Sequence, residues 1–413
     1  MKVLWVSLRI FSTEKEKQTA VWLKALAESL ANKENIEIIN VSKSNSNTVE
    51  SFHYGNIKQF AIPTKKLNKY GDIDSAAAQN FIKIVNEIKP DIIQIWGTEN
   101  PFGFLPLTQN LPGIKLLTLQ GVLSSMGPCN LRGFTLREII STIGIREILI
   151  GNSILHITKS FFDDVLRENR MIENVQFVLN QSEWTDSQIL AVNNQVKLYR
   201  TERVLRFEFL GTKKWVNFDH EINKPIIYTS ALGYSWKGLH SLLKAAIYLK
   251  NYQPNFQLRI AGRYGRTDWL GEGYLRFMLR LIKKHNLQEN IIWLGAIDGY
   301  QIVNELQNAH VYVNPSFVES YSNALAEAMM IGTPSVVSFA GAMPELADNN
   351  KEALFYTPGD HKRCAFLINK LIIDKELSTK LSQNAVIRAE QRNNPIAIAE
   401  NQYQIYKDLL KNN

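Results

Sequence analysis

Asn314-Pro-Ser-Phe-Val-Glu319-Ser-Tyr-Ser-Asn323-Ala-Leu-Ala-Glu327-Ala-Met-Met-Ile-Gly332-Thr-Pro334 is the stretch of this 413-residue chain that decides its fold. The β-prone run at 311–313 predicts a strand that ends where the stretch begins. Hydroxyl and amide side chains at 320–323 are typical of a helix N-terminus, and residues 324–331 favour the helix itself. The glycine and proline that close the stretch predict the end of that helix, and residues 335–338 predict the next buried strand.

Two carboxylates, Glu319 in the loop and Glu327 in the helix, lie on either side of the predicted helix N-terminus. The first backbone N–H groups of a helix have no partner within it and carry partial positive charge, so residues 320–323 are a natural phosphate site. Carboxylates beside a phosphate would be repelled by it, so both glutamates are expected to accept hydrogen bonds from neutral hydroxyls. A molecule with hydroxyls on both sides of a diphosphate is a nucleotide sugar. The alternative is an ordinary amphipathic helix with two solvated glutamates.

The spacing Glu319-x7-Glu327, preceded by Pro315-Ser316 and followed by Glu-Ala-Met and Gly-x-Pro, resembles the donor-site signature of retaining glycosyltransferases of family 4, within the glycosyl transferases group 1. The resemblance implies an α/β chain with the GT-B fold, in which two doubly wound, Rossmann-like parallel-sheet domains face a central cleft. It also implies that Glu327 holds the ribose hydroxyls and Glu319 faces the transferred sugar. The backbone amides that would hold the diphosphate are those of Ser320, Tyr321, Ser322 and Asn323.

A second motif, Lys237-Gly238, resembles the family's phosphate-binding Lys-Gly, in which the lysine neutralises charge on the leaving diphosphate. By resemblance, Lys237 and Glu319 are therefore the candidate catalytic residues. The family commonly has an arginine five residues before this lysine, where the chain has Leu232, and Arg263 is the candidate replacement. The other donor-site residues that the resemblance implies are Gly238, Gly262, Ala296 and Ile297, the last two through backbone contacts to the base.

The length of the chain predicts two or three domains, of which two fit best. Strand-helix-strand patterns predict a parallel sheet in each half. The expected division is a first, acceptor-binding domain at 1–210, a linker at 211–225, and a nucleotide-sugar-binding domain at 226–394. Residues 395–413 are expected to form a helix that packs back toward the first domain.

In the first half the predicted strands at 2–7, 91–96 and 115–119 end in polar loops, and ligands of open α/β sheets bind beyond such ends. The candidate acceptor-binding residues are Arg9, Glu99, Gln120 and Arg132. Two features depart from the family: the loop after the first strand has Phe11-Ser-Thr13 where members often have a Gly-Gly pair, and Gln120 stands where many have a histidine. Residues 153–157 are expected to form another strand.

A net charge of +8 and a pI near 9.2 favour an anionic partner. The basic residues are scattered and form no nucleic-acid-binding module, so nucleic acid is excluded as the expected partner. Residues 124–150 mix arginines with apolar residues and predict a basic amphipathic segment that could lie on an anionic membrane. The alternative for residues 124–150 is a helix with one solvated face. The alternative to an anionic partner is a basic surface that is simply solvated.

Location and cofactors follow from what the sequence contains. Two widely separated cysteines suggest a reducing compartment, and the most apolar window, 139–157, is interrupted by charged residues. We therefore expect a cytoplasmic protein, peripheral on the inner face of the membrane. No Asp-x-Asp or similar acidic cluster predicts a metal site, so we expect no obligatory cofactor, and a UDP-sugar or GDP-sugar as the donor substrate.

Three functions are compatible with these motifs. The first is a retaining glycosyltransferase that moves a sugar from a nucleotide sugar to a hydroxyl of a glycan or lipid-linked acceptor, in the synthesis of a surface polysaccharide such as lipopolysaccharide or capsule, or of a glycolipid. The second is a catalytically impaired nucleotide-sugar-binding module, because the Gly-Gly pair, the histidine and the arginine are missing. The third is another activity of the same fold, an epimerase or a phosphorylase.

Overall fold

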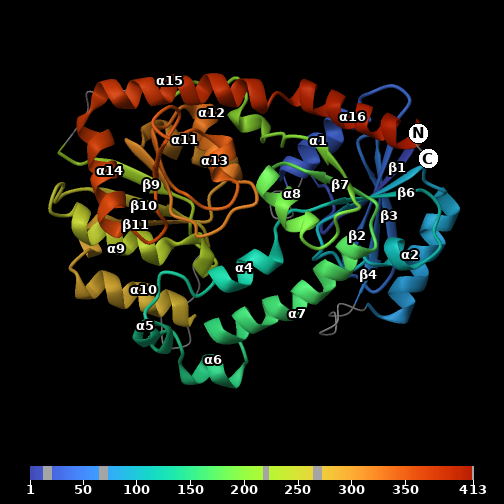
Figure 1. Cartoon of the computed structure of the whole chain (residues 1–413), viewed down its shortest axis with the longest axis horizontal. Helices are drawn as coiled ribbons and strands as arrows, with labels where there is room; N and C mark the ends of the chain where they lie inside the picture. Colours follow the sequence, from blue (N-terminus) through green and yellow to red (C-terminus); the bar gives the residue numbers. More distant parts are fainter. Residues whose placement is uncertain (13–20, 65–72, 217–222, 264–271, 412–413) are drawn as a thin grey trace. The chain divides into compact units, whose positions relative to one another are not determined.

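The structure of the protein is a computed structural model, and it describes residues 1–12, 21–64, 73–216, 223–263 and 272–411. The chain divides into two compact units (Figure 1). Unit 1 consists of Met1–Ser124, Phe162–Arg206 and Asn393–Asn413, and unit 2 of Ser125–Phe161 and Phe207–Arg392. Each unit is built around one β-sheet.

This division differs from the expected domains in two places. Residues 125–161, expected in the first domain, group with unit 2, because their side chains and carbonyl groups bond to helices of that unit. The described part of the expected linker also groups with unit 2: Trp215 Nε1 donates to the Ala309 carbonyl at 2.8 Å, and Lys214 Nζ to the Met330 carbonyl at 2.9 Å. Residues 217–222 of the linker lie outside the described residues.

The sheet of unit 1 has eight strands in the part of the chain that the structure describes. Their order in the sheet is β3 (Glu50–Tyr54), β4 (Ile57–Pro63), β2 (Glu37–Ser44), β1 (Lys2–Val6), β5 (Ile92–Trp96), β6 (Ile114–Thr118), β7 (Phe177–Asn180) and β8 (Lys197–Arg200). All neighbours are parallel except β3 and β4, which form an antiparallel hairpin at the edge. The predicted parallel sheet is confirmed, and the antiparallel strand β3 is added at its edge.

Buried apolar strands and amphipathic helices account for the unit 1 fold. The central strand β1 is buried from Val3 to Val6, as expected of a parallel strand covered on both faces. Its helices within the described residues are α1 (Val21–Ala31), α2 (Ser75–Ile88), α3 (Leu105–Thr108), α8 (Glu183–Leu190) and α16 (Pro395–Lys411), together with the second half of α7 (Ile154–Glu173). Asp74 caps α2 by accepting a hydrogen bond from the Ala77 N–H at 2.9 Å.

The last helix, α16, packs within unit 1 and lies beside α1 (Figure 1). Tyr406 is fully buried, and its hydroxyl accepts a hydrogen bond from Trp5 Nε1 at 3.0 Å and donates one to Gln94 Oε1. Burial raises the pKa of Tyr406 well above its usual range. The C-terminal end of the chain thus completes the core around β1.

The sheet of unit 2 has six strands in the described residues, all parallel. Their order is β11 (Ile291–Gly295), β10 (Gln257–Ala261), β9 (Ile226–Thr229), β12 (Val311–Asn314), β13 (Ser335–Ser338) and β14 (Leu354–Tyr356). The helices that follow these strands or complete the unit are α9 (Leu239–Leu249), α10 (Gly273–Lys284), α11 (Gly299–Asn308), α12 (Asn323–Ile331), α13 (Met343–Leu346), α14 (His361–Ile373) and α15 (Lys375–Arg392). The predicted order of strand, loop, helix and strand around α12 is confirmed.

The segment 125–161 adds short helices to unit 2: most of α4 (Leu123–Cys129), α5 (Leu136–Ser141), α6 (Ile145–Leu149) and the first turns of α7. The strand expected at 153–157 was wrong. Ser153 Oγ accepts a hydrogen bond from the His156 N–H at 3.3 Å and so begins the helix α7 instead. A short apolar run fits a buried helix turn as well as a strand, which is why its pattern misled the prediction. Throughout the described ranges, no helix combines the length and apolar character needed to cross a membrane.

Candidate functional site

The predicted donor-site residues follow the carboxyl ends of four neighbouring strands of unit 2. Lys237 and Gly238 come after β9, Gly262 and Arg263 after β10, Ala296 and Ile297 after β11, and the 319–323 loop after β12. Because the strands are parallel, these carboxyl ends lie along one edge of the sheet. Ligands of open α/β sheets bind at such an edge.

Lys237 and Glu319, far apart in the sequence, form an ion pair in this structure. Lys237 Nζ lies 2.8 Å from Glu319 Oε1 and 3.1 Å from Oε2. Glu319 is only 6% exposed, and Ser316 Oγ donates a second hydrogen bond to Oε1 at 2.8 Å. Gly238 lets the two loops approach this closely, since a side-chain carbon there would fall 2.0 Å from the Pro315 carbonyl oxygen. The site therefore holds a cation and a carboxylate in contact at the sheet edge.

Hydrogen bonds from the end of β13 and from the turn after it hold the Glu319 loop in place. The Ala342 N–H donates to the Glu319 carbonyl at 2.8 Å, and Ser338 Oγ donates to the Ser316 carbonyl. Gly341 has a φ of 55°, and a side-chain carbon there would fall 2.1 Å from the Glu319 carbonyl oxygen. The sequence analysis did not assign Gly341 or Ser316 a role. The signal for Gly341 was its place in the Ala-Gly-Ala-Met-Pro-Glu run that follows the central motif.

Residues 320–323 lie at the N-terminus of α12, as predicted, and Ser320, Tyr321 and Ser322 are buried. Ser322 is the N-cap: its Oγ accepts from the Leu325 N–H at 3.2 Å and from Asn314 Nδ2 at 2.8 Å. Asn314, the last residue of β12, thereby fixes the rotamer of the cap, a role that the sequence analysis missed. The hydroxyl of Ser322 thus satisfies the Leu325 amide in the first turn of α12, which is not among the amides predicted to bind the phosphate.

Two further groups at this helix bear on ligand binding. Asn323 Oδ1 is buried and has no hydrogen-bond partner among the described residues, which suits it to accept from a ligand N–H or O–H group. Glu327 is 8% exposed and lies one turn into α12. Both acceptors are on the helix whose N-terminus favours negative charge.

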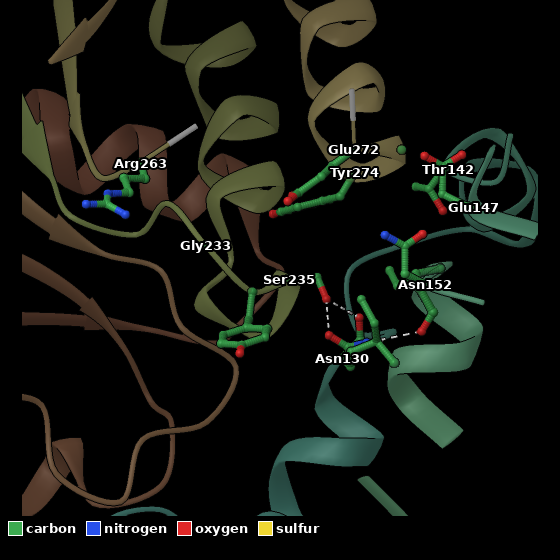
Figure 2. A pocket seen from close by; sticks show the side chains of 13 residues that line it. Asn130, Thr142, Glu147, Asn152, Gly233, Ser235, Arg263, Glu272 and Tyr274 are labelled. Atoms are coloured by element: carbon green, nitrogen blue, oxygen red, sulfur yellow. Dashed lines mark hydrogen bonds between the residues drawn. The ribbon is translucent and has the colours of Figure 1, made fainter. Parts of the chain in front are cut away.

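A cavity of about 330 Å³ opens within unit 2 between the sheet edge and the 125–161 segment (Figure 2). Gly233, Ser235 and Arg263 line it from the loops after β9 and β10, and Glu272 and Tyr274 from the start of α10. The opposite wall, from the segment, consists of Asn130, Thr142, Glu147, Asn152, Ile154 and Ile157. Figure 2 shows Arg263 at one end of the cavity and Glu147 and Asn152 at the other, so the charge of Arg263 lies away from these two side chains.

Glu147 is a nearly fully buried carboxylate in the wall of this cavity, at 2% exposure. Burial alone would raise the pKa of Glu147, but the Arg276 guanidinium at 2.6 Å and the Gly144 amide at 2.8 Å hold it below its ordinary value. Its second oxygen, Oε1, has no hydrogen-bond partner in the described part of the chain, although Arg146 Nη1 lies 3.7 Å away. Asn152 Oδ1 is likewise buried without a hydrogen-bond partner there. This end of the cavity therefore offers acceptors to a neutral, hydroxyl-bearing group.

The acceptor candidates do not all lie in one unit. Arg9, Glu99 and Gln120 follow the neighbouring strands β1, β5 and β6 of unit 1, so they share the carboxyl edge of that sheet. Arg9 is exposed, and the Gln120 carbonyl accepts a hydrogen bond from Arg203 Nη2 at 3.3 Å. Arg132, in contrast, belongs to unit 2, where its carbonyl accepts from His240 Nε2 at 2.9 Å.

A buried carboxylate that the sequence analysis missed organises the unit 1 edge. Glu168 on α7 is 1% exposed and accepts hydrogen bonds from Thr98 Oγ1 at 3.1 Å and from the N–H groups of Leu123 and Ser124 at 3.1 and 3.2 Å. Burial raises the pKa of Glu168, and burial together with the Glu168 charge raises that of Glu99. The sequence signal for Glu168 was its spacing: it lies three residues after Val165 and four before Ile172, which places it on the same, inward-facing side of α7 as these apolar residues.

The arrangement of the His, Cys, Asp and Glu side chains bears on metal binding. Across the ranges that the structure describes, no group of three or more His, Cys, Asp or Glu side chains could hold a metal ion.

Comparison with known proteins identifies what parts of this chain resemble. Residues 214–388 match the model of the family described as Glycosyl transferases group 1. Among curated relatives, Protein CapJ of Staphylococcus aureus is 30% identical over 142 residues, 34% of this chain and 33% of the relative. An N,N'-diacetylbacillosaminyl-diphospho-undecaprenol alpha-1,3-N-acetylgalactosaminyltransferase of Campylobacter jejuni is 27% identical over 198 residues, 48% of each chain. The aligned regions thus span between a third and a half of these two relatives.

Solved structures resemble the whole chain at low identity. Sucrose-phosphate synthase of Thermosynechococcus elongatus has a TM-score of 0.72 at 16% identity and covers 100% of both chains. Anabaena Alr3699/HepE, solved in complex with UDP and glucose, has a TM-score of 0.67 at 15% identity and covers 99% of both chains. At these identities the likeness establishes the fold. By these comparisons, residues 214–388 match the group 1 glycosyl transferases, and the chain around them has the fold of the GT-B glycosyltransferases.

Proposed function

We propose that the protein transfers a sugar from a nucleotide-sugar donor to a hydroxyl acceptor, with retention of configuration at the anomeric carbon. The observation that carries this proposal is the contact between Lys237 and Glu319 beside the N-terminus of α12. That arrangement combines a cation, a helix N-terminus and a buried carboxylate at one sheet edge. It suits a substrate in which a diphosphate separates two hydroxyl-bearing groups.

The proposed chemistry is stabilisation of the leaving group. When the bond between the anomeric carbon and the diphosphate breaks, negative charge grows on the phosphate oxygen. Lys237, released from Glu319, and the N–H groups that begin α12 would offset that charge, as preorganised donors do in an oxyanion hole. Glu319 would then accept hydrogen bonds from the transferred sugar, and Glu327 from the ribose.

The cavity extends this proposal to the sugar. Arg263 would lie toward the diphosphate, while Glu147 Oε1 and Asn152 Oδ1 offer acceptors that favour neutral hydroxyls and disfavour a second anion. Ala296 and Ile297 would meet the base, with Gly262 at the turn before Arg263. A UDP-sugar is the favoured donor because Anabaena Alr3699/HepE, which has the same fold, was also solved in complex with UDP-glucose, and a GDP-sugar is the alternative.

The proposed acceptor is a glycan or a lipid-linked sugar, in the synthesis of a surface polysaccharide or glycolipid. The Campylobacter relative is named for a diphospho-undecaprenol acceptor, which supports the lipid-linked form. Arg9, Glu99 and Gln120 on unit 1 would contact this acceptor. A peripheral location on the cytoplasmic face of the membrane belongs to the same proposal, because a lipid-linked acceptor lies there.

The test uses thermal shift with a panel of UDP, GDP and their sugars. A nucleotide present at a hundred times its dissociation constant should stabilise the wild type by roughly 2.7 kcal/mol. Glu327→Ala should lose that shift, because it removes the ribose acceptor, whereas Lys237→Ala should still bind nucleotide and lose most of its turnover. Glu289→Ala, an exposed residue before β11 at the opposite edge of the sheet, is the matched control and should behave as wild type.

Two results would contradict the proposal. Unchanged nucleotide binding by Glu327→Ala would refute the donor-site assignment. Nucleotide binding without transfer to any acceptor in a panel of glycans and polyprenyl-linked sugars would instead favour a binding module of the same fold.

A further inference from the structure

Unit 2 exposes a cluster of large aliphatic side chains on the 125–161 segment. We call it the apolar shelf. Each member is between 46% and 80% exposed, and the members are Leu136, Ile140, Ile145, Ile148, Leu149, Ile150 and Leu155. They lie on α5, on α6 and the residue after it, and on the first turn of α7. Contiguous exposed apolar patches are rare on soluble proteins and mark surfaces that contact something.

The shelf is held rigidly on unit 2. His240 of α9 is fully buried, and its Nε2–H donates to the Arg132 carbonyl at 2.9 Å, while its ring stacks on Phe134 at 3.9 Å between centroids. Lys244, one turn further along α9, donates to the Gly133 carbonyl at 2.7 Å. Arg280 of α10 donates to the Ser141 carbonyl. The shelf is therefore fixed to the unit that carries the candidate donor site.

Within residues 136–160 the exposed charges have one sign, and the next exposed charge along α7 is the acidic Asp163. Residues 136–160 contain two acidic side chains, Glu138 and Glu147. Both turn inward to basic residues of unit 2: Glu138 to Lys244 at 2.8 Å and Glu147 to Arg276 at 2.6 Å. The exposed charged side chains that are left on this stretch are basic, Arg137 and Lys159.

We propose that the apolar shelf docks unit 2 onto an anionic lipid bilayer. Aliphatic side chains flanked by basic ones, on helices of five and six residues that are too short to span, suit insertion into the headgroup boundary. A protein partner is a poorer fit, since interface cores are rich in aromatic residues and the shelf has none.

This inference goes beyond the proposed transfer reaction, since the shelf is outside the candidate donor site and its binding is measured without donor or acceptor. The consequence for the enzyme is orientation. The donor unit, with Lys237 and Glu319, would be the part that is held at the membrane surface.

The experiment is co-sedimentation of the full chain with vesicles of phosphatidylglycerol and phosphatidylcholine in equal parts, and with phosphatidylcholine alone. The wild type should partition onto the anionic vesicles, and less so at high salt. Ile148→Ser with Leu149→Ser should lower that partition about tenfold. Arg137→Glu should lower it on anionic vesicles while leaving the weak partition onto neutral ones unchanged.

The matched control is Ile373→Ser with Ile387→Ser. These two isoleucines are similarly exposed, at 60% and 58%, on α14 and α15 of the same unit, and their replacement should leave partition unchanged. Unchanged melting temperatures of both double variants would show that each folds. Equal partition by the shelf variant and the wild type would overturn the proposal. So would light scattering that shows a wild-type dimer and a monomeric shelf variant, because the shelf would then be a contact between copies.

Discussion

Lys237 and Glu319 satisfy each other's charge at the edge of the unit 2 sheet, and a ligand must replace that contact. Glu319 is 6% exposed and also bonded to Ser316, whereas the Lys237 side chain is 38% exposed. The lysine is therefore the partner that can turn toward a phosphate, while the carboxylate stays in place. This asymmetry fits a mobile cation and a fixed hydrogen-bond acceptor.

His240 is a second residue whose environment decides its charge. Burial lowers the pKa of His240 from 6.5 to about 3, and its neutral ring donates to the Arg132 carbonyl and accepts from the Tyr274 hydroxyl. Between pH 6.5 and pH 3 the unfolded chain binds a proton there that the folded chain does not. The free energy of unfolding should therefore fall as the pH falls through this window.

Urea unfolding at pH 7 and pH 5 measures this effect. His240 should account for a loss of about 2 kcal/mol between these two pH values, and His240→Gln should remove that part of the pH dependence. His53→Gln, on the exposed edge strand β3, should keep it. An identical pH dependence in wild type and His240→Gln would show that the buried ring does not titrate as described.

At the scale of elements, the helix α12 and its flanking strands were predictable because every local signal agreed. Pro315, the hydroxyls at 320–323 and Gly332 each had one structural meaning. The short run at 153–157 was compatible with either a strand or a helix, and tertiary context made it a helix. The strand β3 lies at the sheet edge and no residue of it is buried, so it lacked the buried apolar pattern that marked the other strands.

The motifs of the candidate site could be predicted from the sequence, but the residues and strands that hold them in place could not. Lys237 and Glu319 were expected from their motifs, but their contact depends on the parallel neighbours β9 and β12, which the sequence does not order. Neither Glu147 nor Glu168 was predicted to have a role in the site. Only the packed structure reveals that each faces inward onto hydrogen-bond donors.

The N-terminus of α12 yields a prediction about its cap. Ser322→Ala should lower the free energy of unfolding by about 1 kcal/mol, because the Leu325 amide loses its acceptor. It should also weaken nucleotide binding roughly fivefold, since the amides at this helix start are the proposed diphosphate site.

Ser182→Ala is the matched control for this cap. Ser182 begins α8 of unit 1 and accepts from the Thr185 N–H at the same 3.2 Å. It should give a similar loss of stability in urea unfolding with unchanged nucleotide binding by calorimetry. Equal nucleotide affinities in both variants would argue against a ligand at the start of α12.

On the scale of the molecule, the core of unit 1 depends on its last helix. Tyr406→Phe removes the acceptor of Trp5 Nε1–H and the donor to Gln94, and should cost about 1–3 kcal/mol in unit 1. Amide hydrogen exchange should speed up in β1 and β5 and stay unchanged in β12. Tyr403→Phe, on the same helix but only half-buried, should change little. Equal acceleration in both units would mean that they unfold as one.

Unit 1 is assembled from three separate pieces of chain, Met1–Ser124, Phe162–Arg206 and Asn393–Asn413. During synthesis the first piece leaves the ribosome early, yet the hydrogen bonds of Trp5 and Gln94 with Tyr406 cannot form until Tyr406 has emerged, 401 residues after Trp5. Both pieces of unit 2 are by then complete, since it ends at Arg392. The unit whose first piece is made first is therefore the unit that completes its core last, and the apolar face around β1 lacks its α16 cover until that helix has emerged.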